Sequence, residues 1–384
     1  MSGAVLALSL AALKGPSGAP LQILLLEASA PELHRHPGFD ARAIALSAGT
    51  CEALARHGLW SRFAPHCAPI THIHVSDRGH CGQTRLTAAQ FGLPALGQVI
   101  ELSAAGIELQ QAMDATANIR LCCPAQLSTI APQEEGVTLT LASGERYQTR
   151  LLVAADGGNS FVRQHFKLPV SRHDYEQSAM IATVKTAEDP AGRAFERFTE
   201  GGPLALLPIG PDYAVVFTVP PEKATQITAL DDREFLLALN AQFGHRLELV
   251  ATGPRASFPL ALRLRRQLTR DRQVWLGNTA QTLHPVSGQG FNLGLRDAWE
   301  LAETLLKHSQ DDPGRPEPLA AYARGRQTDR IGSAVFTDGI VRLFSNDIPP
   351  LKALRGIGLF ALDLAPPLRH FVARRMIWGA RAWL

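Results

Sequence analysis

The first apolar stretches of the chain have the lengths of a helix and of a strand. Residues Ala4 to Leu13 are almost all apolar, and Lys14-Gly15-Pro16 would end a helix there. Leu21 to Leu26 is a continuous apolar run of strand length, and it ends at the acidic residue Glu27. The chain is therefore predicted to begin with a helix followed by a buried strand.

Further helices and strands follow up to about residue 170. One helix is predicted from Ala48 to His57, and another follows Glu101 and ends near Thr116. Residues 119–150 alternate apolar and polar positions around a Ser143-Gly144 turn, as hairpin strands do. This order of elements predicts an α/β lobe.

Strand patterns dominate from residue 171 to residue 262, with one predicted helix from Arg233 to Phe243. Thr71 to Leu96 looks like a hairpin excursion from the first lobe. We therefore predict a second lobe built on an antiparallel sheet. The predicted division is 1–70, 97–170 and 263–345 for a discontinuous first lobe, 71–96 and 171–262 for the second, and 346–384 for a C-terminal helical segment.

Composition favours a globular protein in a reducing compartment. Of the 384 residues, 46% are hydrophobic and 19% are charged, and the net charge of +3 gives no electrostatic case for nucleic acid. The five cysteines form no CxxC pair, which argues against a metal centre or a disulfide framework and favours the cytoplasm. The apolar start lacks the basic flank of a signal peptide and is too short to span a bilayer.

The segment from Val274 to Asp297, VWLGNTAQTLHPVSGQGFNLGLRD, carries the most candidate chemistry. A short apolar strand breaks at Gly277, and a loop with Gly288-Gln289-Gly290 leads into a helix with one apolar face. Glycines at a helix start let a ligand approach the backbone, where free N–H groups favour negative charge. The segment predicts a site for a phosphate or for the electron-rich edge of a reduced flavin.

A second candidate lies earlier, where a predicted buried strand from Leu151 to Ala155 runs into Asp156-Gly157-Gly158. A strand followed by an Asp-Gly turn is common and, taken alone, is more often structural. Because it precedes the Val274–Asp297 segment in the expected order, we predict that it places a carboxylate and a flexible turn beside the same ligand.

These two motifs resemble those of the FAD-dependent aromatic-hydroxylase flavoprotein monooxygenases, most of all their ubiquinone-biosynthesis branch. Gly277-Asn278 departs from the Gly-Asp usual in that family, although Asn still offers a hydrogen bond to a ribityl hydroxyl. The resemblance implies an α/β fold: a Rossmann-like FAD-binding domain with a second, antiparallel-sheet substrate domain, of the p-hydroxybenzoate-hydroxylase type. It also implies hydroxylation of a polyprenylated phenol of the 2-octaprenyl-6-methoxyphenol type through a flavin peroxide, with NAD(P)H as co-substrate.

Site residues follow from the same resemblance. His284 and Pro285 are the catalytic candidates at the flavin edge, although a lone histidine in a packed loop is more often structural. Residues 194–198 and 203–208 are expected to face the flavin from the sheet, where spacing alone predicts core strands. The expected cofactor-binding residues are Gly3, Glu27, Arg42, Asp156, Gly157, Gly277, Asn278, Gly288, Gln289, Gly290 and Asn292.

One expected part of the FAD site is missing from the sequence. Met1-Ser2-Gly3 looks like the tail of a Gly-x-Gly-x-x-Gly turn, so a strand of about five or six residues and two glycines are expected ahead of it. Without them, the chain is expected to bind FAD weakly or to fold poorly. Two alternatives stay open: a hydroxylase of another ubiquinone precursor or a soluble phenol, and a non-catalytic scaffold subunit.

The C-terminal segment from Ile348 to Leu384 mixes Leu, Ala and Pro with arginines. Two short amphipathic helices, broken at Pro366-Pro367, are predicted to cap the fold, to meet a partner subunit or to lie on a membrane surface. The expected partners are a prenylated phenol, dioxygen and, through this segment, a biosynthetic complex or the inner membrane. The expected location is the cytoplasm or the membrane periphery.

Overall fold

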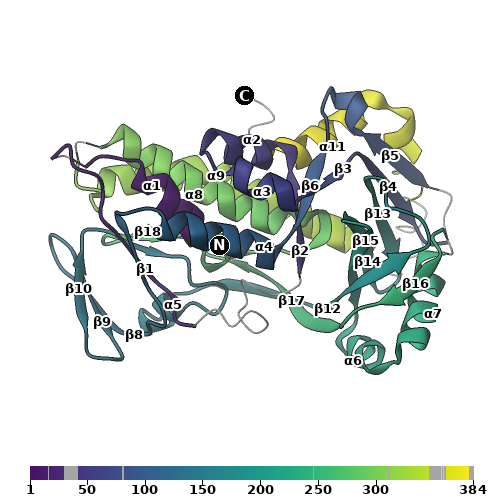
Figure 1. Ribbon diagram of the computed structural model, residues 1–384, viewed down its shortest axis with the longest axis horizontal. Coiled ribbons are helices and arrows are strands. Elements are labelled where there is room, and N and C mark those ends of the chain that lie inside the picture. Colours follow the sequence, from purple (N-terminus) through teal and green to yellow (C-terminus); the bar gives the residue numbers. More distant parts are fainter. Residues whose placement is uncertain are drawn as a thin grey trace.

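The computed structural model describes residues 1–15, 17–29, 42–79, 82–244, 246–309, 311–345, 356, 358 and 360–379. These residues form two lobes that lie side by side (Figure 1). The lobe on the left of the view has helices over small sheets, and the lobe on the right is built on a nine-stranded sheet. Part of the predicted C-terminal segment, 346–355, 357, 359 and 380–384, lies outside the described residues.

Two pairs of parallel strands form the centre of the first lobe. β1 (Ile23–Leu26) pairs with β7 (Ile119–Cys122), and β11 (Leu152–Ala154) pairs with β19 (Gln273–Trp275). A short β18 (Thr269–Arg270) joins β19 in the antiparallel sense. Among the described residues no strand links β1 to β11, so the two parallel pairs belong to separate sheets. The strands predicted near residues 21–26, 151–155 and 274–276 are confirmed.

Helices cover these strands. The apolar α1 (Ser2–Ala11) packs along α8 (Gln289–Lys307), and both bury residues in the same core as the apolar side chains of β11 and β19. The predicted helices near residues 4–13, 48–57 and 102–116 are confirmed. The remaining short helices of this lobe are α2 (Ala48–Arg56), α3 (Trp60–Phe63), η1 (Ala64–His66), η2 (Ala88–Phe91), α4 (Leu102–Asp114) and α5 (Phe161–His165).

Two three-stranded sheets complete the first lobe. The order β2-β6-β3 joins β2 (Ala43–Ser47), β6 (Gly97–Glu101) and β3 (Ala68–Ile70), and brings the chain after Arg42 beside the second lobe. The order β10-β9-β8 joins β10 (Arg146–Thr149), β9 (Val137–Leu141) and β8 (Leu127–Pro132).

The second lobe is a nine-stranded sheet in the order β20-β17-β12-β15-β14-β13-β4-β5, with β16 beside β12. Its neighbours are antiparallel except for β13 and β4, which run parallel. The strands are β4 (His72–Asp77), β5 (Gln83–Thr87), β12 (Ser171–Thr186), β13 (Arg193–Thr199), β14 (Gly202–Ile209), β15 (Asp212–Val219), β16 (Leu249–Thr252), β17 (Ala256–Leu264) and β20 (Gln281–Thr282).

The two faces of this sheet have different neighbours because side chains alternate along each strand. Met180, Leu204 and Val215 pack under α6 (Pro221–Ala229) and α7 (Asp232–Phe243). The alternate positions, such as Ile181, Ala205 and Val216, line a cavity. The helix predicted from Arg233 is confirmed as α7, whereas α6 was not predicted.

The longest helix was also not predicted. α9 (Pro316–Phe344) packs against α8 and buries several charged residues on its inner side. Near the end of the described chain, residues 360–364 are helical and α11 (Pro366–Trp378) follows. The two prolines stand at the start of α11, where a proline is tolerated because the first N–H groups of a helix have no partner. Two helices that meet at these prolines are therefore confirmed.

Candidate functional site

A cavity of about 2340 Å³ lies between the two lobes. Its walls include β1, β11 and the turn after β19 at one end, and the sheet of the second lobe at the other. Its volume is more than twice the roughly 1,000 Å³ at the upper end of ordinary ligand pockets. The cavity therefore has room for a large ligand and a second molecule. The space between β1 and β11 is part of it, because residues of both strands line it.

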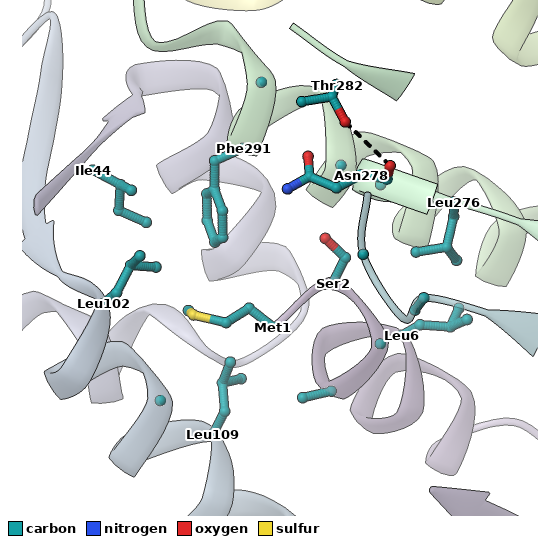
Figure 2. Close-up of a pocket in the computed structure, with 18 of the residues that line it drawn as sticks. Met1, Ser2, Leu6, Ile44, Leu102, Leu109, Leu276, Asn278, Thr282 and Phe291 are labelled. Carbon is teal, nitrogen blue, oxygen red and sulfur yellow. Dashed lines mark hydrogen bonds between the residues drawn. The ribbon is translucent and has the colours of Figure 1, made fainter. Parts of the chain in front are cut away.

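The turn after β19 is held open to the cavity by its glycine. Gly277 has φ +58, a left-handed conformation, and begins η3 (Gly277–Thr279). A Cβ there would lie 3.1 Å from Ser2 Oγ, so a larger residue would push against the start of α1. The Gly277 N–H donates to Asp297 Oδ2 at 3.0 Å. As Figure 2 shows, the side chains of Asn278 and Ser2 point into the same space.

The Asp-Gly motif meets this turn through Thr279. Its hydroxyl donates to Asp156 Oδ1 at 3.2 Å and accepts from the Gly157 N–H at 3.0 Å. Asp156 Oδ2 also accepts from the Val162 N–H at 3.2 Å, so the carboxylate is fixed at the cavity wall. The two motifs that the sequence singled out therefore lie together, and Thr279, which joins them, was not predicted.

The Gly288 turn introduces α8 at the cavity. Gly288 has φ +62, ends η4 (Val286–Gly288) and caps α8, while a Cβ on Gly290 would meet no atom within 4 Å. Gly288 and Gly290 line the cavity at this helix start, where the helix dipole favours negative charge. The structure places both glycines at the cavity wall, and their contact with a cofactor stays a prediction.

The side chains of Gln289 and Asn292 hold this turn in place. Asn292 accepts from the Ser47 N–H at 2.9 Å and donates to the carbonyls of Ala45 and Gly288, both at 2.8 Å. Gln289 donates to the carbonyl of Met376 in α11 at 3.0 Å. Neither side chain lines the cavity, so any contact of these residues with a cofactor falls to the backbone.

His284 and Pro285 border the cavity between the two motifs and the sheet. His284 is fully buried, and its Nδ1 accepts from the Val286 N–H at 3.1 Å, so the neutral ring carries its hydrogen on Nε2. Burial lowers the pKa of His284 to about 4. Its ring stands edge-on to Tyr175 at 5.2 Å. At neutral pH His284 is therefore an uncharged hydrogen-bond donor, not a base.

The remaining predicted residues also border the cavity. Gly3 lies in the first turn of α1, where a Cβ would come within 3.1 Å of Ala155 Cβ. Glu27 follows β1, and its Oε1 accepts from the Ser29 N–H at 3.2 Å. Arg42 precedes β2 and lies over the Phe258 ring at 5.1 Å, which places its charge where the lobes meet.

Apolar residues separate these polar groups. Met1, Ile44, Leu102, Leu109 and Phe291 form one wall of the cavity beside Ser2 and Asn278 (Figure 2). No group of three or more His, Cys, Asp or Glu side chains in the described parts of the chain is placed to hold a metal ion. The site therefore suits a large, mostly apolar ligand with a few anionic or hydroxyl groups at its polar end.

The sequence matches a known family, described as "FAD binding domain", over residues 8–329. The ubiquinone hydroxylase UbiL of Rhodospirillum rubrum is 32% identical over 358 residues, which cover 92% of this chain and 83% of UbiL. The 3-demethoxyubiquinol 3-hydroxylase of Escherichia coli is 30% identical over 335 residues, covering 86% of this chain and 85% of that protein.

The fold is also similar to solved structures. The crystal structure of p-nitrophenol 4-monooxygenase PnpA from Pseudomonas putida aligns with a TM-score of 0.80 at 16% identity, covering 99% of this chain and 96% of PnpA. The two-lobed α/β architecture expected from the sequence is therefore confirmed.

Proposed function

This chain belongs to the FAD-binding family of flavin-dependent monooxygenases, with ubiquinone hydroxylases among its relatives, and we propose that it hydroxylates a polyprenylated phenol in ubiquinone biosynthesis. The observation that carries this proposal is the continuity of the cavity. One end holds the turns at Gly277 and Gly288, and the other end is an apolar sheet face large enough for a hydrophobic ring compound.

The residues at the polar end fit FAD. Ser2 and Gly3 at the start of α1 offer N–H groups to a diphosphate beside Asn278. Glu27 lies at a strand end that suits a ribose, and Asp156 and Asn278 offer an acceptor and an amide to ribityl hydroxyls. The open space at Gly290 leaves room for a flat ring against the start of α8.

When bound, FAD takes a hydride from NAD(P)H and activates dioxygen for transfer of one oxygen atom to the ring. The N–H groups at Gly288 and Gly290 favour negative charge beside them. His284 Nε2–H is a donor without a partner among the described residues, and it offers a hydrogen bond to a ligand in the cavity. The apolar walls exclude water, which limits loss of the activated oxygen.

We propose further that the C-terminal helices rest on a membrane surface. Arg369, Val372, Ala373 and Met376 of α11 line the cavity, so this element lies between the site and its surroundings. No helix in the described ranges has the length and apolarity needed to cross a bilayer, so the contact would be peripheral. Four large apolar side chains of the segment are exposed: Phe360, Leu364, Leu368 and Phe371.

Sedimentation with lipid vesicles tests this contact. The double change Leu364→Ser and Leu368→Ser removes two of the four exposed apolar groups, and we expect most of the vesicle-bound fraction to be lost. Leu237→Ser on α7, equally exposed but in the other lobe, is the matched control and keeps wild-type binding. Equal binding by the wild type and the double variant would rule out this surface.

The enzymatic proposal is tested on the purified protein with FAD. In excess FAD we expect the protein to perturb the flavin absorbance bands, and we expect NAD(P)H oxidation that a short-chain prenylated 2-methoxyphenol stimulates. A prenyl compound that lacks the phenol ring, used in place of the phenol, should not stimulate NAD(P)H oxidation. A protein that leaves the flavin absorbance unchanged even in excess FAD, or whose oxidation of NAD(P)H does not respond to the phenol, would contradict the proposed function.

A further inference from the structure

The sheet face that borders the cavity is a regular array with a single carboxyl group in its middle row. The hydrogen-bond register places one residue from each of seven strands side by side: Thr84, Val75, Glu196, Ala205, Val216, Ile181 and Ala256. All seven line the cavity, and all but the threonine and Glu196 are apolar.

The rows on either side of Glu196 contribute apolar side chains from β13 to the same face. On β13 the side chains of Ala194 and Phe198 point to the same face as Glu196, because positions two apart share a face. Ala194 packs with Ala43 and Ala45 of β2, and Phe198 packs with Val286 of the Gly288 turn. Since Ala45 also lies 3.5 Å from the Cβ position of Gly288, Glu196 faces the part of the cavity next to that turn.

Glu196 has no internal role that explains it. Its Oε1 is buried and makes no hydrogen bond within the described residues. A carboxyl group held in an apolar wall without a partner is costly, so such groups occur where a ligand supplies the partner. Burial raises the pKa of Glu196 to about 7, which leaves it able to accept or release a proton near neutral pH.

We propose that Glu196 binds the ring hydroxyl of the substrate and accepts its proton during hydroxylation. This inference rests on the proposed function, since it assigns the phenol its place on the sheet. The phenolic O–H bond breaks and its proton passes to the Glu196 carboxylate, while the ring carbon ortho or para to that oxygen forms the new C–O bond. The ring carbon then loses its hydrogen as a proton, Glu196 returns a proton to the ring oxygen, and the aromatic ring is restored. Dioxygen supplies the oxygen atom and NAD(P)H supplies two electrons, and the second oxygen atom leaves as water with the proton that the ring carbon lost.

Other charged groups lie on the sheet near Glu196 or line the cavity, and they bear on the pH dependence. Asp77 of β4 stands opposite Phe198, and Arg42 and Arg255 lie toward the β17 side. Arg369 of α11 lines the cavity, and so does His284, a neutral ring in the loop before η4. β14, β15 and β12 contribute no charged side chain to the three rows described.

The test compares a phenol with its methyl ether in the FAD-loaded protein. Short-chain prenylated 2-methoxyphenol and its O-methyl ether are titrated while the flavin absorbance is followed. We expect the wild type to bind the phenol at least about tenfold more tightly than the ether, and Glu196→Gln and Glu196→Ala to lose that preference. The kcat of Glu196→Gln is expected to fall about 100-fold or more. The rise of the wild-type rate through a pH near 7 is expected to be absent in this variant.

Glu200→Gln makes the same chemical change at an exposed turn and should match the wild type. If the wild type hydroxylates the phenol and Glu196→Gln keeps both the preference and the pH profile, the assignment of Glu196 is wrong and the proposed function stands. If no phenol perturbs the flavin or is hydroxylated by the wild type, the proposed function fails, and the assignment falls with it.

Discussion

Two regions of the molecule hold buried charge in different ways: the contact between α8 and α9, and the cavity face of the nine-stranded sheet. Between the helices, the two buried carboxylates pair with arginines, and Arg330 donates to the Gln281 side chain. Asp297 accepts from Arg326 Nε at 2.7 Å, and Asp329 accepts from Arg296 Nε at 2.8 Å. On the sheet, Glu196 Oε1 has no partner within the described residues.

The two environments shift the pKa values of their charged groups for different reasons. Burial lowers the pKa of Arg326, but the neighbouring carboxylates Asp297 and Asp329 together outweigh it, so the pKa is raised. Burial without a partner raises the pKa of Glu196 to about 7. Paired charges of this kind hold elements in register, whereas an unpaired one at a cavity wall is a candidate for chemistry. The paired charges between α8 and α9 also contact the candidate functional site, because Asp297 accepts a hydrogen bond from the Gly277 N–H.

The largest expected effect comes from removing a carboxylate from the buried ion pairs between α8 and α9. Asp297→Ala removes one of the two carboxylate partners of the buried Arg326 and frees the Gly277 N–H, so we expect the free energy of unfolding to fall by about 3–5 kcal/mol. Denaturant unfolding followed by circular dichroism measures this loss. Arg172→Ala, which removes an exposed pair with Asp174, is the control and should cost less than about 1 kcal/mol. Similar losses in both variants would remove the distinction between buried and surface pairs.

A second prediction concerns the stability of the unpaired region against pH. Because the pKa of Glu196 is higher in the folded than in the unfolded state, the folded state binds more protons between pH 4.5 and about 7. Its contribution to stability is therefore present below the unfolded value and is lost as pH rises through the folded value. Glu196→Gln should gain up to about 3 kcal/mol over the wild type at pH 8, and this gain should vanish near pH 4.

The same denaturant series at several pH values checks this prediction. A gain that is equal at both ends of the pH range would mean that packing, not titration of Glu196, separates the two proteins. Glu200→Gln, which alters an exposed carboxyl group, should show no pH-dependent difference from the wild type.

The smallest effect is expected at the turn between the two regions. Gly288→Ala must adopt φ +62 with a side chain, which costs about 1–2 kcal/mol, although its Cβ meets Ala45 only at an ordinary 3.5 Å. Gly339→Ala lies within α9 in open space and should instead gain about 0.5–1 kcal/mol. Thermal unfolding of the two variants measures both signs. A gain for Gly288→Ala would show that the turn does not need its left-handed residue.

The sequence predicted best the parts of the site that are contiguous in the chain. Gly277 and Gly288 interrupt apolar patterns at strand and helix ends, and both have the positive φ that makes glycine necessary. Asp156 was placed beside them by order alone, and the Thr279 hydroxyl confirms that the two motifs meet. The direction in which a motif side chain points could not be predicted from the sequence. Asn292 and Gln289 form hydrogen bonds with the protein itself, and no pattern along the chain indicates this.

Long-range pairing explains what the sequence missed. α9 buries Arg326, Asp329 and Arg330, so its inner face lacks the apolar spacing that identifies a helix. Glu196 lies in a segment expected to face the flavin, yet the apolar row around it is built from six other strands. A carboxyl group surrounded in space by apolar residues is not distinguishable along the chain from one at a surface.

Isotopically labelled dioxygen tests the central claim most directly. The FAD-loaded protein is given NAD(P)H, labelled dioxygen and the short-chain prenylated 2-methoxyphenol, and the product is examined by mass spectrometry. The account predicts one labelled oxygen atom in each hydroxylated ring and none taken from labelled water. Oxidation of NAD(P)H with no label in the phenol would contradict it, because the cavity would then hold a flavin but not perform hydroxylation.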